Sequence, residues 1–220
     1  VAMGIGGNNY YKNCYVDLKE SCLRSETTVK VFDQMRKLQS YTDEGSPGRD
    51  WNVATGMVIE GKAGFQIMGD WAKGEFTAAG KTPGVDYYCS PTPSNNGYLY
   101  NVDSFIFYKT SDPDKQEGQK LLAKLMMGKN FQKVFNLYKG SIPARLDVSM
   151  DEFDKCAKTS NADIKTAGAS GGLVPSFAHG MAQGNTMKAA LQDIITEHFN
   201  SDMSSVDAAN ALADSVLANM

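Results

Sequence analysis

The sequence is poor in the residue types that most metal and enzyme sites require. It has only two histidines, His179 and His198, and no C-x-x-C pair among its four cysteines. We therefore expect no metal site and no cofactor. The G-x-S-x-G, H-E-x-x-H and P-loop patterns are also absent, which removes the usual signatures of serine hydrolases, zinc peptidases and nucleotide-binding loops. The motifs indicate no catalytic residue.

An excess of one charge sign and long apolar runs are equally lacking. The chain has 22 basic and 25 acidic residues and a formal charge of −3, with both signs interspersed, so we expect no nucleic acid partner. No apolar run approaches the roughly 18–20 residues that span a bilayer, so the sequence predicts no membrane-spanning segment. Residues 1–9 do not resemble a signal peptide and begin with Val, and we expect a processed or truncated product.

What the sequence does contain is enough apolar material for a packed core. Of its 220 residues 42% are hydrophobic and 10% are aromatic, which excludes disorder as the main state. The apolar periodicity predicts short strands at 64–68, 86–90 and 98–108. It predicts helices over 9–18, 25–38, 113–127, 130–139, 153–156, 187–195 and 206–217. The order predicts an α/β protein with fewer strands than a domain of this length usually has.

Three side chains in strand-like contexts are candidates for binding a ligand. On a strand, Asn101 and Asp103 would point to the same face, where an amide and a carboxylate can hold vicinal hydroxyls. The same pair also fits a turn or a strand end in solvent. Trp71 would follow the strand at 64–68, where its indole could stack on a sugar ring, although a half-buried core tryptophan explains it equally well.

Two further residues have both a binding interpretation and a structural one. Lys139 could contact a ligand, or it could only complement the dipole at the end of its helix. His179 lies in a predicted loop and could donate to a ligand or to a neighbouring carbonyl. His198 lies in a predicted helix, and we interpret it as a surface histidine.

The cysteines leave the redox state open. Cys14, Cys22, Cys89 and Cys156 are an even number without metal-site spacing. They fit two disulfides in an oxidising compartment or four buried thiols in a cytosolic protein.

Five stretches together point to a known family. The most specific is GKAGFQIMGDWAKGEF at 61–76, and the others are GRDWN at 48–52, YNVDSF at 100–105, KGSIPAR at 139–145 and LVPSFAHGM at 173–181. In this order they resemble the periplasmic sugar-binding proteins of bacterial ABC importers, within extracellular solute-binding protein family 1. The glucose-binding branch is the most similar.

The resemblance implies the fold and its division. It implies an α/β fold of the periplasmic binding protein type II kind, with two lobes joined by crossovers, of which this chain is an incomplete C-terminal portion. Residues 1–100 would form the first part of the C-terminal lobe. Residues 101–147 would return to the N-terminal lobe through hinges near 99–103 and 143–148, and 148–220 would form the helical tail of the C-terminal lobe.

The resemblance also implies a site and partners. The family's sugar contacts fall on Asn101, Asp103, Lys139 and His179, with Trp71 as a stacking wall. The implied partners are a monosaccharide, with glucose expected, a membrane permease, and the missing N-terminal half of the same protein. The implied location is the periplasm, and no bond would be made or broken.

A periplasmic location in turn favours disulfides. The resemblance implies Cys89 paired with Cys156, which leaves Cys14 with Cys22 as the second pair. Closing the longer of these loops would stabilise the fold by roughly 3–5 kcal/mol in the chain-entropy description.

Two other functions compete with transport. A carbohydrate-active hydrolase could use Asp103 with a second carboxylate at catalytic separation. A module that only docks to other proteins is also compatible with the sequence. A return segment without its lobe would, in addition, leave the apolar faces of 102–144 in need of another cover.

Overall fold

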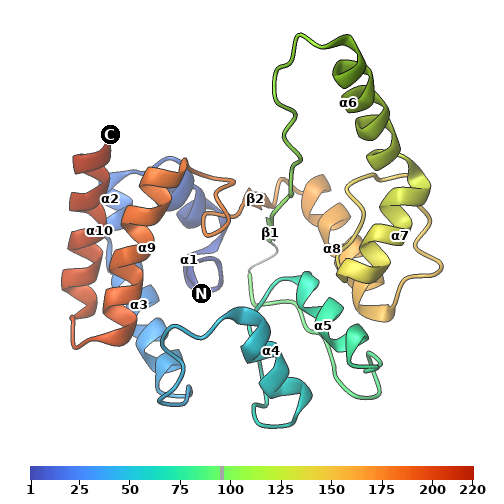
Figure 1. Ribbon diagram of the computed structural model, residues 1–220. Helices are drawn as coiled ribbons and strands as arrows, with labels where there is room; N and C mark the ends of the chain where they lie inside the picture. Colours follow the sequence, from blue (N-terminus) through green and yellow to red (C-terminus); the bar gives the residue numbers. More distant parts are fainter. Residues whose placement is uncertain (95–96) are drawn as a thin grey trace. The chain divides into compact units, whose positions relative to one another are not determined.

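The computed structural model describes residues 1–94 and 97–220 and divides into two compact units (Figure 1). Unit 1 contains residues 1–49, 91–101 and 164–220, and unit 2 contains residues 50–90 and 102–163. The chain therefore passes from one unit to the other several times. The division into lobes stays a prediction, because these units are defined within this chain alone.

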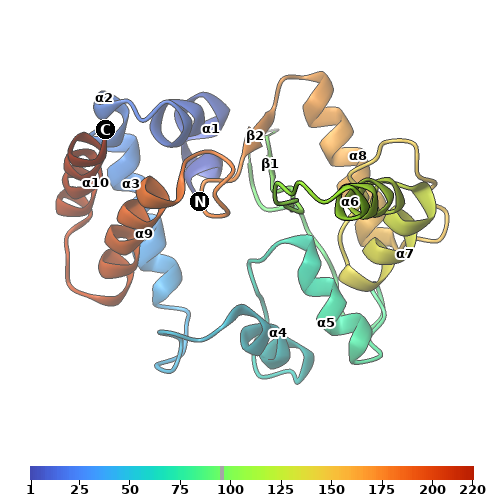
Figure 2. The ribbon, with the colours of Figure 1, turned by 45° about the horizontal axis from the view of Figure 1, so that its top comes forward.

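Unit 1 is mainly a helical layer. Its helices are α1 (Ala2–Tyr11), the π-helix η1 (Lys12–Val16), α2 (Glu20–Leu23), α3 (Glu26–Gln39), α9 (Asn185–Asn200) and α10 (Ser205–Asn219), and α8 (Lys155–Ala169) enters it from unit 2. Figures 1 and 2 show α9 and α10 side by side, and α10 also contacts α3. The core lies between these helices and includes the fully buried Leu23, Val174, Leu191 and Leu212.

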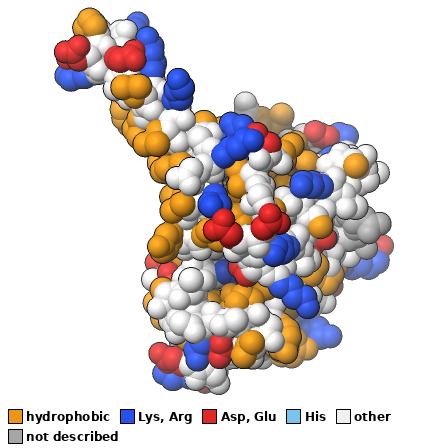
Figure 3. Space-filling model, turned by 90° about the vertical axis from the view of Figure 1, so that its right-hand side faces the viewer, with side chains coloured by type: hydrophobic (Ala, Val, Ile, Leu, Met, Phe, Trp, Pro, Cys, Tyr) orange, Lys and Arg blue, Asp and Glu red, His pale blue; other side chains and the backbone are white. Residues whose placement is uncertain are grey.

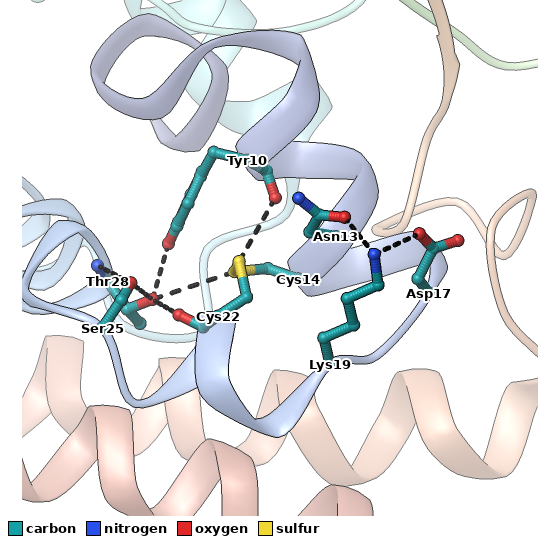
Figure 4. The surroundings of a disulfide bond; sticks show 8 residues. All are labelled: Tyr10, Asn13, Cys14, Asp17, Lys19, Cys22, Ser25 and Thr28. Carbon is teal, nitrogen blue, oxygen red and sulfur yellow. Dashed lines mark hydrogen bonds and ion pairs between the residues drawn. A yellow bond between two sulfur atoms is a disulfide. The ribbon is translucent and has the colours of Figure 1, made fainter.

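A disulfide fixes the connection between η1 and α2. Cys14 and Cys22 are bonded at 2.00 Å (Figure 4). The Thr28 hydroxyl of α3 donates to the Cys22 carbonyl at 2.8 Å and also lies 2.8 Å from the Tyr10 hydroxyl. In unit 2, Cys89 and Cys156 are bonded at 2.12 Å. Both pairings implied by the resemblance are confirmed.

Unit 1 contains one short parallel strand pair. β1 (Tyr98–Tyr100) pairs with β2 (Leu173–Pro175), with Leu99 opposite Val174. The strand predicted over 98–108 therefore ends at Tyr100, and the strands predicted at 64–68 and 86–90 are absent. A strand requires a hydrogen-bonding neighbour, and within the described residues the segment 86–90 has only the isolated bridge from Tyr87 to Pro83, while 64–68 has no bridge.

Unit 2 is built from helices joined by long connections. They are α4 (Trp51–Ile59), the 3-10 helix η2 (Asp70–Ala72), α5 (Lys73–Ala78), α6 (Pro113–Met126), α7 (Lys129–Lys139) and the start of α8. α6 begins at Pro113 as predicted, and Asp112 caps it by accepting from the Asp114 N–H at 3.0 Å. Gly140 ends α7 with φ of 86°, a left-handed conformation that suits glycine.

Two predicted helix starts are wrong. The helix predicted over 130–139 begins one residue earlier, at Lys129, and the residue before it is Gly128. The helix predicted over 153–156 is also misplaced at its start, because residues 153 and 154 are not helical. α8 begins later, where Asp154 accepts from the Ala157 N–H at 2.8 Å. Among the described residues, no helix combines the length and the hydropathy that crossing a bilayer requires.

His198 is buried, which corrects its interpretation as a surface residue. Its side chain on α9 is 0% exposed, and its ring packs on Phe32 of α3 with centroids 4.7 Å apart. Its Nε2 lies 3.4 Å from the Ser205 hydroxyl. Burial lowers the pKa of His198, the charge of Arg36 lowers it further, and Asp33 opposes the shift. The neutral imidazole is therefore the form that the core accepts.

This burial predicts a pH dependence of stability. Because the pKa of His198 is lower in the folded state, the unfolded chain binds more protons as the pH falls. We expect the free energy of unfolding to decrease below the unfolded pKa of about 6.5 and to level off below the folded pKa. Denaturant titrations at several pH values should show this decrease in the wild type and in His179→Gln, whose histidine is exposed. An unchanged pH profile in His198→Gln would contradict the prediction.

Candidate functional site

In unit 1 the structure connects two of the predicted contact residues through the strand pair. Asn101 directly follows β1, and the loop that carries His179 directly follows β2. The Ser176 N–H donates to the Tyr100 carbonyl at 2.8 Å. The hydrogen bonding between the two strands therefore extends to the first residue after β2. The Ser176 hydroxyl lies 2.7 Å from His179 Nδ1. Asn101 and His179 thus extend from the carboxyl ends of adjacent parallel strands, where open α/β folds bind ligands.

The buried Tyr11 forms hydrogen bonds with the backbone of the loop that carries His179. The Tyr11 hydroxyl donates to the Pro175 carbonyl at 3.1 Å and accepts from the Phe177 N–H at 2.9 Å. Phe177 is 5% exposed and packs against the ring of Tyr15, 5.8 Å between centroids. Burial raises the pKa of the Tyr11 hydroxyl, so it stays protonated and keeps its donor role. His179 itself is exposed on this fixed loop.

In unit 2 the other two polar candidates form an ion pair. Lys139 Nζ contacts Asp103 Oδ2, and it also lies 5.7 Å from the centroid of the Phe135 ring. Lys139 is the last residue of α7, directly before the left-handed Gly140. The interpretation of Lys139 as a solvated residue that only complements the helix dipole is therefore incomplete, because its ammonium group has a specific carboxylate partner.

Trp71 is positioned by the same end of α7. It is half-buried in η2, and the neighbouring Asp70 interacts with the Ser141 hydroxyl and the Ile142 N–H. Burial raises the pKa of Asp70, while these hydrogen bonds and the charges of Lys73 and Lys139 lower it.

The backbones of α5 and of the end of α7 also meet directly. A Cβ on Gly74 would lie 2.9 Å from the Lys139 carbonyl oxygen, and one on Gly140 would lie 2.6 Å from the Gly74 nitrogen. Only two glycines allow this approach, because real Cβ atoms do not come so close to backbone. The backbones of the segments that carry Trp71 and Lys139 are therefore packed directly against each other.

An ion pair between the buried Lys73 and the partly exposed Asp154 lies next to these segments and was not found by sequence reasoning. Lys73 Nζ lies 2.9 Å from Asp154 Oδ2, with the lysine side chain 7% exposed. Asp154 also caps α8, two residues before the disulfide at Cys156. Burial and the nearby Asp154 raise the pKa of Tyr87 to about 12. Lys73 lies within the specific 61–76 stretch, but nothing in its spacing points to Asp154.

The five predicted contacts thus form two groups, one in each unit. Asn101 and His179 belong to unit 1, and Trp71, Asp103 and Lys139 belong to unit 2. The prediction that Asn101 and Asp103 share a strand face is wrong, because β1 ends before both of them. Each group offers amide, imidazole, carboxylate or ammonium partners for hydroxyls. The single site made of all five residues stays a prediction.

A family assignment now supplements this geometry. Residues 7–166 match the family described as bacterial extracellular solute-binding protein. This is most of the chain and includes Trp71, Asn101, Asp103 and Lys139.

The chain belongs to the family of bacterial extracellular solute-binding proteins.

Relatives of this solute-binding chain are longer than it is. A probable sugar-binding periplasmic protein of Brucella suis is 46% identical over 211 residues, covering 96% of this chain and 50% of that protein. A protein of Rhizobium meliloti with the same description is 43% identical over 211 residues, 96% of this chain and 51% of that protein. An uncharacterized ABC transporter extracellular-binding protein of Pyrococcus horikoshii is 32% identical over 196 residues, 89% of this chain and 43% of that protein. The solute-binding chain spans about half the length of the curated relatives it matches.

A solved structure shows the same fold. A Streptococcus pneumoniae solute-binding protein, determined in complex with the blood group A-trisaccharide, superimposes with a TM-score of 0.67 at 18% identity. The superposition covers 100% of this solute-binding chain and 55% of that chain. The expected fold, an incomplete portion of a periplasmic binding protein, is confirmed.

We expect the ion pair between Lys73 and Asp154 to contribute to the free energy of unfolding. Lys73→Met would leave the Asp154 carboxylate without its cation in a partly dry environment. We expect the free energy of unfolding to fall by about 1–3 kcal/mol, since Asp154 is partly exposed. Urea denaturation measures it.

Lys62→Met is the matched control, because Lys62 pairs with Glu60 on the surface with side chains 67% and 58% exposed. Such pairs contribute below about 1 kcal/mol. Equal losses in the two variants would contradict the role given to Lys73.

Proposed function

We propose that this chain is part of the substrate-binding component of an ABC importer, and that the whole protein binds a monosaccharide, glucose in the first place, in the periplasm. The sugar would lie between two lobes that close about it by hinge motion and would then pass to a membrane permease. No bond is made or broken. The names of the relatives, two of them described as sugar-binding and periplasmic, support this proposal.

The observation that carries it is the pairing of Lys139 with Asp103. A carboxylate in an ion pair remains an acceptor with several lone pairs, and the ammonium group has three donors. Together they can bind vicinal hydroxyls, which offer both donors and acceptors. Trp71, fastened next to the end of α7, would add the apolar face against which a pyranose ring stacks.

Glucose is proposed because the five sequence stretches resemble the glucose-binding branch, and this resemblance implies sugar contacts at Trp71, Asn101, Asp103, Lys139 and His179. In such a site each sugar hydroxyl is buried against a partner of its own. A sugar that lacks or inverts one hydroxyl leaves a buried polar group unpaired, at a cost of about 1–3 kcal/mol. We therefore propose that glucose binds more tightly than galactose.

Calorimetry tests the sugar assignment on the protein expressed from the complete gene that encodes this chain. We expect heat with glucose, and a loss of roughly tenfold or more in affinity for Asp103→Asn, Lys139→Met and His179→Gln, since each removes a charge-assisted or neutral hydrogen bond. Lys62→Met should bind as the wild type does. Absence of heat with glucose, galactose and maltose would remove the assignment.

The same sample distinguishes binding from hydrolysis. A hydrolase would need a second carboxylate at a defined separation from Asp103; the contact that the structure gives between Asp103 and Lys139 supports binding instead. We expect no release of reducing sugar from oligosaccharides and aryl glycosides. Release that Asp103→Asn abolishes would favour the hydrolase.

We also propose that the N-terminal half of the same protein covers an apolar face on α6 and α7. This face lines a groove of about 500 Å³ between the two helices. Its apolar members are Leu121, Leu125, Phe131 and Val134. Leu121 and Leu125 are 59% and 61% exposed, and Figure 3 shows hydrophobic side chains along the arm that contains α6. The support for this occupant is the half-length match to the relatives.

Substitutions on α6 test this cover in the complete gene product. Leu125→Ala would remove a side chain that the proposal buries, so we expect a loss of about 2–4 kcal/mol in the free energy of unfolding. Leu217→Ala on α10 is the matched control, since Leu217 is 53% exposed and should change stability by less than about 0.5 kcal/mol. Equal, small changes in both variants would show that nothing packs on this face.

A further inference from the structure

Ser176 is a buried residue that contacts His179 and the residue directly before Asn101. It is 1% exposed and is the first residue after β2. Its N–H donates to the Tyr100 carbonyl at 2.8 Å, directly before Asn101. Its carbonyl accepts from the Met181 N–H at 2.9 Å, which closes the loop around His179. Its hydroxyl lies 2.7 Å from His179 Nδ1.

Hydrogen bonds that do not involve the Ser176 hydroxyl position the backbone of the loop that carries His179. Tyr11 binds both the Pro175 carbonyl and the Phe177 N–H. The Gln192 side-chain amide of α9 donates to the Ala178 carbonyl at 3.1 Å. These contacts determine where the Cα of His179 lies. The contact with the Ser176 hydroxyl, in contrast, acts on the imidazole ring itself.

The ring orientation decides what His179 presents to a ligand. In a neutral imidazole one nitrogen is a donor and the other is an acceptor, and the partner of one nitrogen determines the role of the other. If the Ser176 hydroxyl donates to Nδ1, the proton of the imidazole resides on Nε2. The opposite edge of the ring then presents an N–H donor to a hydroxyl oxygen.

We propose that Ser176 is a positioning residue that holds His179 in one ring orientation and in the Nε2–H tautomer, so that His179 donates to an oxygen of the bound sugar. This inference rests on the proposed sugar-binding function. The side chain of Ser176 acts only through His179. Its backbone, through Tyr100, holds the start of the Asn101 segment in the same register.

Nitrogen NMR of the histidine rings tests the tautomer without any ligand. In the ligand-free wild-type protein we expect His179 to show a protonated Nε2 and an unprotonated Nδ1, assigned by their disappearance in His179→Gln. In Ser176→Ala the two signals should move toward the average of exchanging tautomers, while Ser176→Thr, which keeps a hydroxyl, should retain them. The buried His198 serves as a reference, and its signals should stay unchanged.

Calorimetry with glucose then tests the consequence. We expect Ser176→Ala to bind roughly tenfold more weakly, as for the loss of one hydrogen-bond donor from a fixed position, and Ser176→Thr to recover most of this loss. Ser170→Ala is the matched control, because the Ser170 hydroxyl donates only to helix carbonyls, at 3.1 and 3.2 Å, in the same unit. It should leave both readouts unchanged.

The outcomes separate the two proposals. An Nδ1–H tautomer in the wild type, or His179 signals that Ser176→Ala leaves unchanged, would overturn the role of Ser176. A changed tautomer with unchanged glucose affinity would overturn the positioning role as well. No sugar binding by the wild type, with the tautomer as expected, would instead remove the proposed function while keeping the contact between Ser176 and His179.

Discussion

The parallel pairing of β1 with β2 is the constraint on which the polar residues of unit 1 depend. It brings together two segments that lie far apart in the sequence, with Tyr98 opposite Leu173 and Tyr100 opposite Pro175. Because the strands are parallel, the residues that follow them leave the same edge. Asn101 and the His179 loop are therefore neighbours for a backbone reason, whatever their side chains do. The bond from the Ser176 N–H to the Tyr100 carbonyl extends this pairing to the residue directly before Asn101.

Features set by local chemistry could be predicted from the sequence. Ser25 caps α3, Asp112 caps α6, and Gly140 ends α7 in a left-handed conformation, each because one side chain or one missing Cβ satisfies nearby backbone groups. Features that need a distant partner could not be predicted. Phe65 lies inside the strand expected at 64–68 and is 96% exposed. The alternating pattern of this segment is typical of a strand, but a strand forms only where a neighbouring strand pairs with it.

In the candidate site, too, the residues that depend on distant partners could not be predicted from the sequence. The resemblance named the groups that would touch a sugar, and the structure adds the groups that hold them: Tyr11 and Ser176 in unit 1, and Lys73 with Asp154 in unit 2. A serine, a tyrosine and a surface-like Lys–Asp pair are common in any sequence. Their role appears only when the fold places them beneath a contact residue. His198 shows the converse, since a helical histidine beside a glutamate looks exposed until α3 is seen to cover it.

These supports bear on the choice between binding and catalysis. Selective binding of hydroxyls requires donors and acceptors that are fixed before the ligand arrives, because ordering them on binding would reduce the affinity. In each unit the candidate groups meet this condition: His179 through Ser176 and a tyrosine-fastened loop, and Lys139 through Asp103 and the glycine contact at the end of α7. An acid–base pair would instead require two carboxylates in different environments, whereas Asp103 has a cation as its partner. The fixed donors and acceptors of both groups therefore support the proposed binding of sugar hydroxyls.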